Sequence, residues 1–196
     1  MSELRQKILD ASVDLIAEKG VRALSFREVA RRAGVSHQAP YHHFGNYLGI
    51  LRAIAVEGFS GLTVAMQSAA DAHADPLEAL IAGGVAYVRH ARTHVGHFRV
   101  MFDQALVSIH DPEAPLVEAE ATHGTLVELV TRAHAAGHGA HLPLDVLTVL
   151  CWSTVHGLAV FLVEGVLEAK APLTVEEQEG LSNAVVAALG GLLRAP

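Results

Sequence analysis

The chain contains 196 residues, of which 51% are hydrophobic, with one cysteine and a formal net charge of −7. This length accommodates one large domain or two unequal ones, and a single cysteine excludes an internal disulfide. Charged residues interrupt the N-terminal segment, so a secretory signal is not expected and we predict a cytoplasmic protein.

Charge is divided unequally along the chain. Residues 1–52 contain eight of the fourteen Lys and Arg residues but only five of the twenty-one Asp and Glu residues, a formal charge of +3 that leaves −10 for the remainder. The N-terminal segment therefore suits a polyanion such as nucleic acid, and the rest of the chain repels one.

The first predicted helix has one apolar stripe. The stripe follows the spacing i, i+3, i+4, i+7 and i+8, through Ile8, Ala11, Ser12, Leu15 and Ile16. Gly20 stands where a helix commonly ends in left-handed backbone conformation, so the helix is expected to end there.

The second predicted helix starts at a capping box. In this motif the Ser25 hydroxyl accepts a bond from the amide of Glu28, and the Glu28 carboxylate accepts one from the amide of Ser25. The helix would bury Phe26, Val29, Ala30 and Ala33. It would leave Arg27, Arg31 and Arg32 outside. Gly34 then ends it.

A third, shorter helix is predicted from His37 to Phe44. Ser36 would cap it, and Pro40 is acceptable because it falls in or beside the first turn. Two short helices joined by about three residues around a glycine form a helix-turn-helix. The outward side of the second helix presents His37, Gln38, Tyr41 and His42.

Helical patterns continue to the end of the chain. Further helices are predicted over residues 47–72, 76–92, 94–109, 114–137, 143–168 and 174–194. The predicted fold is all-α, with an N-terminal three-helix helix-turn-helix domain over residues 1–50 and a larger helical domain over residues 51–196. Val146–Val163 is long and apolar enough for a membrane span, but Asp145 and Glu164 flank it and no Lys or Arg anchors it, which favours a helix in a dimer interface.

Several segments resemble the N-terminal domain of TetR regulators. They are Ile8–Ala11, Glu18–Gly20, Ser25–Ser36 and Tyr41–Phe44. The resemblance extends over roughly the first fifty residues, and no gap is needed to match the segments to the family pattern. The resemblance implies a ligand-released repressor that binds a palindromic double-stranded DNA operator as a homodimer. It also implies that residues 143–168 and 174–194 pair with their symmetry mates, which suits the stripe of Ala184, Val185, Ala188, Leu189, Leu192 and Leu193.

The chemistry of the residues agrees with this resemblance. Phosphates are bound by helix-start amides, hydroxyls and cations, which suits Ser25, Arg27, Ser36, Tyr41 and His43. Base edges in the major groove would be read by His37, Gln38 and His42. Alternatively, His43 packs beneath the first helix, and Arg31 or Arg32 is only solvated surface.

Two positions depart from the TetR pattern. A Lys commonly follows the recognition helix, where this chain has Tyr47, and His37 stands in place of the usual basic residue at the start of that helix. We therefore expect weaker phosphate binding, with greater sensitivity to pH and salt.

The C-terminal part carries a second resemblance, to the TetR subgroup with a Trp-His-Gly ligand-binding domain. Trp152–Ala159 contains Trp152, His156 and Gly157 at the required spacing, and Phe98–Phe102 also fits. A small, mostly apolar effector is expected. Its candidate pocket residues are Tyr87, Phe98, Met101, Phe102, Trp152 and His156, although such residues more often form the core.

Other functions are less well supported by the sequence. Two histidine sets repeat the spacing i, i+4, i+7, His90 with His94 and His97, and His134 with His138 and His141, but glycines interrupt both, so neither a metal nor a cofactor is expected. An enzyme would need His156 with Glu164 or Asp103 as acid and base, without a nucleophile in place. A ligand-binding protein that has lost DNA affinity is the third alternative.

Overall fold

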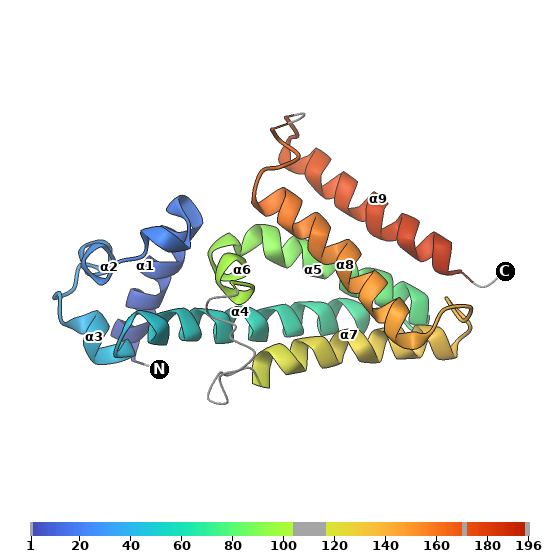
Figure 1. Cartoon of the computed structure of the whole chain (residues 1–196), viewed down its shortest axis with the longest axis horizontal. Helices are drawn as coiled ribbons and strands as arrows, with labels where there is room; N and C mark the ends of the chain where they lie inside the picture. Colours follow the sequence, from blue (N-terminus) through green and yellow to red (C-terminus); the bar gives the residue numbers. More distant parts are fainter. Residues whose placement is uncertain (1, 104–116, 170–171, 195–196) are drawn as a thin grey trace. The chain divides into compact units, whose positions relative to one another are not determined.

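The computed structural model describes residues 2–103, 117–169 and 172–194 (Figure 1). Within these ranges the regular structure is entirely helical, without a strand, which confirms the predicted all-α fold class. The chain forms two compact units, the first made of Met1–Ser60 with His94–Ala119 and the second of Gly61–Thr93 with Glu120–Pro196.

The first unit is organised around its N-terminal helix. Its helices are α1 (Glu3–Lys19), the 3₁₀ helix η1 (Val21–Ala23), α2 (Phe26–Ala33), α3 (Ala39–Phe44), the first part of α4 (Tyr47–Ala70) and α6 (Val95–Met101). α2, α3 and α6 each pack against α1. The predicted stripe of α1 is buried except for Ala11, which is half-buried, and Leu9 adds to it. Its burial supplies the driving force for this unit.

Two glycines end helices where the sequence predicts. Gly20 follows α1 with φ +80°, and Gly34 follows α2 with φ +64° in the left-handed region. Glycine adopts this conformation without the steric cost of a Cβ atom. The buried face of α2 is also as predicted, with Phe26, Val29, Ala30 and Ala33.

The start of α3 differs from the prediction. The helix begins at Ala39 rather than His37, and the Ser36 side chain does not cap it. Residues 37 and 38 instead form a turn in which the Ala39 amide donates to the Ser36 carbonyl at 3.0 Å. Proline explains the difference, because it has no N–H. In a helix starting at His37, Pro40 would be the first residue whose N–H should bond to a carbonyl of the same helix. In a helix starting at Ala39, the residue at this position needs no such bond.

The second unit contains the remainder of α4, α5 (Pro76–Thr93), nearly all of α7 (Val117–Ala135), α8 (Leu144–Val163) and α9 (Val175–Leu193). α5 packs against both α8 and α9. α4 and α7 are joined by hydrogen bonds between the Thr63 and Thr122 hydroxyls at 2.7 Å and from the Gln67 amide to Thr125 at 3.2 Å. These bonds satisfy polar groups on largely apolar surfaces.

Two helices are shorter than predicted. α8 ends at Val163 rather than residue 168, because Gly165 turns the chain with φ +67°. α6 ends at Met101, where the Asp103 amide donates to Val100 and tightens the backbone into a turn. Residues 104–109 of the segment predicted as helix over 94–109 lie outside the described residues, as do the first residues of the helix predicted over 114–137.

α4 and α8 are long and apolar enough to cross a membrane by composition alone, with mean hydropathies of 1.5 and 2.0. In each case 39% of the apolar window is buried inside the protein. Core helices of ordinary folded proteins pass the same test, so the observation gives weak support to a membrane function.

Gly96 provides a test of how closely α6 and α1 pack. A Cβ atom at this position would collide with the backbone carbonyl of Val13, so Gly96→Ala is expected to lower the free energy of unfolding by about 1–3 kcal/mol. Gly124→Ala on α7 is the control, since its Cβ would meet no atom within 4 Å and helix propensity should raise stability by about 0.5–1 kcal/mol. Denaturant unfolding of both variants measures the difference, and equal stabilities would contradict this close packing.

Candidate nucleic-acid interface

α2 and α3 form the predicted helix-turn-helix. They are joined by a turn that begins at Gly34, and α3 is anchored by Pro40 and Phe44, both buried. The edge of the Tyr41 ring meets the Phe26 ring, with centroids 4.7 Å apart and planes at 77°. This contact fixes α3 against α2 while leaving the Tyr41 side chain 55% exposed.

Seven of the eight predicted DNA-binding residues are exposed. These are Ser25, Arg27, Ser36, His37, Gln38, Tyr41 and His42. His37 and Gln38 lie just before α3, at its N-terminal end, rather than within it. His43 is half-buried, with its ring centroid 6.5 Å from that of Phe44. The other seven side chains are therefore open to solvent.

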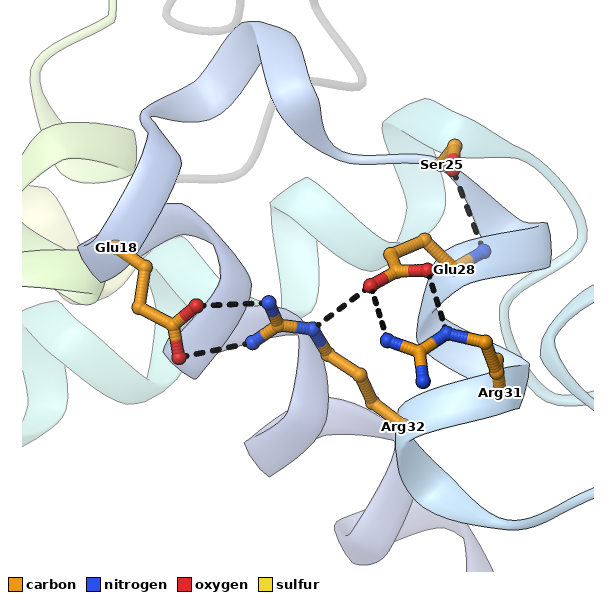
Figure 2. Close-up of polar contacts among 5 residues, drawn as sticks. All are labelled: Glu18, Ser25, Glu28, Arg31 and Arg32. Atoms are coloured by element: carbon orange, nitrogen blue, oxygen red, sulfur yellow. Dashed lines mark hydrogen bonds and ion pairs between the residues drawn. The ribbon is translucent and has the colours of Figure 1, made fainter.

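Only half of the predicted capping box forms at Ser25. The Ser25 hydroxyl accepts a hydrogen bond from the Glu28 amide at 3.3 Å, as predicted. The Glu28 carboxylate, however, turns away from the Ser25 amide and binds Arg31 and Arg32, as Figure 2 shows. Two guanidinium groups attract the carboxylate more strongly than one neutral amide does, which explains why the second bond of the capping box is not formed.

The same carboxylate belongs to an ion-pair network that joins α2 to α1. Arg31 binds Glu28 with both Nε and Nη2, at 2.8 and 2.7 Å, and Arg32 Nε binds Glu28 at 3.2 Å. Arg32 then reaches α1, where Nη1 and Nη2 bind the two oxygens of Glu18 at 2.9 and 2.7 Å (Figure 2). Arg31 and then Arg32 lower the pKa of Glu28 to about 2, and Arg32 lowers that of Glu18.

The network corrects one prediction and refines another. Arg32 was predicted to lie on the outer face of α2, but only 19% of its side chain is exposed. Arg31 is exposed, but its guanidinium is occupied by Glu28. Among these α2 arginines, Arg27 alone makes no ion pair with any residue that the structure describes. The spacing of Glu28 with Arg31 and Arg32 was visible in the sequence, whereas the partnership of Glu18 with Arg32, fourteen positions apart, was not.

The joint between α3 and α4 is also tightly built. Gly45 has φ +74°, and the Asn46 side-chain oxygen accepts a bond from the Gly49 amide at 3.0 Å. A Cβ atom on Gly49 would collide with the carbonyl of Phe44. The Tyr47 hydroxyl donates to the carbonyl of Val21 at 3.1 Å, a contact that sequence reasoning missed.

The predicted pocket residues are divided between the two units. In the second unit, the Tyr87 hydroxyl and His156 Nδ1 are 2.8 Å apart, and the Trp152 and His156 rings lie side by side with centroids at 6.3 Å. Burial raises the pKa of Tyr87 and lowers that of His156, so both side chains of this hydrogen-bonded pair are neutral at neutral pH.

The remaining pocket candidates lie in the first unit. Phe102 contacts Phe98 and Phe59, with ring centroids at 5.2 and 5.5 Å, and Met101 is fully buried. Packing in the core accounts for these contacts, and effector binding by either set stays a prediction. The described residues bring no three metal-ligating side chains together.

Taken together, the helix-turn-helix, its exposed polar face and the second unit, whose described regular structure is helical, are features of a helical DNA-binding protein. Residues 8–54 match the sequence profile described as "Bacterial regulatory proteins, tetR family", and residues 80–193 match the profile "Tetracyclin repressor-like, C-terminal domain". The second match alone spans more than half of the chain. The protein therefore belongs to the TetR family, a family of bacterial regulators rather than of enzymes.

Individual relatives agree with this assignment. The chain is 38% identical over 52 residues to the HTH-type transcriptional regulators SrpR and TtgW, both of Pseudomonas putida, a match that covers 26% of this chain and 24% and 39% of those proteins. A protein of unknown function from a Rhodococcus species is similar along 99% of this chain and 97% of its own, at 30% identity and a TM-score of 0.74. PfmR of Thermus thermophilus, at 24% identity over 96% of this chain and 97% of its own, shares the fold with a TM-score of 0.69.

Glu28 should make stability depend on pH. Its pKa in the folded protein lies below the ordinary value of 4.5, so its ion pairs stabilise the protein above that pH and are lost as the pH falls towards 2. We expect Glu28→Gln to lower the Tm by a few degrees at pH 7, since exposed pairs are weak, and the gap to the wild type to close between about pH 5 and 2.

Glu128→Gln is the matched control. Glu128 is exposed on α7, and none of the described residues forms an ion pair with it. Thermal unfolding followed by circular dichroism across this pH range measures both variants. A gap for Glu28→Gln that is independent of pH would show that the network does not contribute through the charge of Glu28.

Proposed function

We propose that this protein is a ligand-released repressor that binds a palindromic operator as a homodimer in the cytoplasm. Residues 1–50 would form the DNA-binding domain and residues 51–196 the ligand-binding and dimerisation domain. The observation that carries the proposal is the exposed polar face at the start of α3, on a helix-turn-helix of the TetR family.

The exposed residues suit two kinds of contact with a duplex. His37 and Gln38 precede the first turn of α3, the part of a recognition helix that reaches base edges, and His42 lies one turn further on. Gln pairs well with adenine, and a histidine N–H suits the acceptors of guanine. Phosphates would be held by Ser25, Arg27, Ser36, Tyr41 and His43.

A second copy of the chain is the partner that α8 and α9 favour. α8 leaves an apolar face uncovered, formed by Val146, Val149, Leu150 and Phe161. On α9, Leu192 is 79% exposed beside the small residues Ala184 and Ala188. Exposed apolar surface on two helices that pack against each other is typical of a protein interface. A two-fold dimer would place its recognition helices about 34–36 Å apart, or a multiple of that distance.

The effector is proposed to be small and mostly apolar. Tyr87, Trp152 and His156 support this choice, because they combine aromatic surface with one neutral hydrogen-bonding pair. A ligand that binds better to the conformation unable to bind DNA would shift the population away from the operator. Membership of the subgroup with a Trp-His-Gly domain stays a prediction.

Two substitutions test the DNA contacts. Gln38→Ala should lower affinity for the operator about 10- to 100-fold, because a base contact is lost, while leaving affinity for unrelated duplexes unchanged. Arg27→Ala should weaken binding to every duplex and reduce the slope of log affinity against log salt by about 0.9. Fluorescence anisotropy with an operator selected from random duplexes measures both affinities. Ser68→Ala is the control, because Ser68 is exposed on α4, outside residues 1–50.

The selection step also separates this proposal from its alternative. If the wild-type protein at low salt and without ligand retains no palindrome, the protein is a ligand-binding module without DNA function. If a palindrome is retained but Gln38→Ala binds it with full affinity, α3 is not the reading helix.

The dimer has its own test. Val149→Asp and Leu192→Asp would each place a carboxylate on one of the uncovered faces. Burying this charge in an interface without an opposite charge beside it costs several kcal/mol. We expect both variants to be folded monomers by analytical ultracentrifugation, with weakened operator binding. Val64→Asp is the matched control, since Val64 is 62% exposed on α4, outside α8 and α9, and should stay dimeric. A dimeric Val149→Asp variant would contradict the assigned interface.

A further inference from the structure

Tyr47 occupies the position after the recognition helix where the TetR pattern commonly has lysine. It is the first residue of α4, and its hydroxyl donates a hydrogen bond to the carbonyl of Val21 at 3.1 Å. Val21 belongs to η1, in the connection between α1 and α2. A side chain at the end of the helix-turn-helix therefore binds back to the segment at its beginning.

The end of α3 lies in close contact with the first turn of α4, beside Tyr47. The carbonyl of Phe44, at the end of α3, accepts a bond from the Asn46 amide at 2.8 Å and lies against Gly49 too closely to admit a Cβ atom. The Asn46 side chain in turn binds the Gly49 amide at 3.0 Å. The end of α3 and the first turn of α4 are thus in direct contact, and Asn46 is hydrogen-bonded to both.

The chemistry of the phenol separates Tyr47 from lysine. A phenol has a single proton, and when this proton is donated to Val21 none is left for a phosphate oxygen. The side chain is also neutral, so it releases no counterion from DNA. Burial, with a smaller effect from the Asp103 carboxylate, raises the pKa of Tyr47, which keeps the hydroxyl a donor at neutral pH.

We propose that Tyr47 is a positioning residue for DNA recognition rather than a phosphate contact. Its hydroxyl bond to Val21 holds the start of α4 against the connection between α1 and α2, and this orients α3 for reading bases. The inference rests on the proposed DNA-binding function. It explains why a position that carries a cation in the family pattern carries an uncharged donor here: an internal bond replaces a contact with the ligand.

Tyr47→Phe tests the proposal, because it removes the hydroxyl and keeps the ring. Loss of the bond should lower affinity for the selected operator about 3- to 10-fold, while affinity for an unrelated duplex of the same length stays unchanged. The ratio of the two affinities, the specificity ratio, therefore falls. Fluorescence anisotropy at one fixed salt concentration measures both affinities, and circular dichroism establishes the folded fraction.

Tyr41→Phe is the matched control. Its hydroxyl is proposed to contact a phosphate directly. This variant should therefore lower the affinity for both duplexes by the same factor and leave the specificity ratio unchanged. If Tyr47→Phe behaves in that way too, Tyr47 contacts DNA and the proposal is wrong. If Tyr47→Phe lowers only thermal stability and leaves both affinities unchanged, the bond to Val21 is merely structural and the proposal is equally wrong. In both cases the wild type still binds its operator, which separates these outcomes from failure of the proposed function itself.

Discussion

Burial of α1 is the constraint on which the rest of the first unit depends. Ile8, Leu9, Leu15 and Ile16 are almost completely removed from solvent, and α2, α3 and α6 all pack against the helix that carries them. None of those three helices is longer than eight residues, and helices of that length are not stable alone in water. The exposed residues of α3 therefore hold their positions only because an apolar helix behind them is buried.

Polar contacts then refine what this burial sets in place. Arg32 joins α2 to α1 through Glu18, and Tyr47 joins α4 to the connection after α1. The ion pairs also change how the charge of this segment should be understood. Of its eight Lys and Arg residues, Arg31 and Arg32 are paired with carboxylates of the same segment, so on α2 a phosphate contact would depend on Arg27.

The sequence predicted features that depend on neighbours within one or two helical turns. The stripe of α1, the buried face of α2 and the glycines that end both helices follow from local spacing and backbone freedom. It did not reveal features that depend on groups distant in the chain. The Glu28 carboxylate prefers two guanidinium groups to the Ser25 amide, and Tyr47 finds a carbonyl twenty-six residues earlier. For the candidate pocket the local spacing brought Trp152 and His156 together but could not distinguish a pocket from a core, since aromatic residues at helical spacing serve both.

The uncovered faces of α8 and α9 have a consequence for how much of this protein a cell must hold. If a second copy covers them, the dimer that binds the operator forms only above a threshold of chain concentration, because assembly follows mass action. Below that threshold, operator occupancy falls with roughly the square of the amount of protein. Abundance would then act as a signal alongside any effector, and a small change in synthesis or degradation would produce a steep change in transcription.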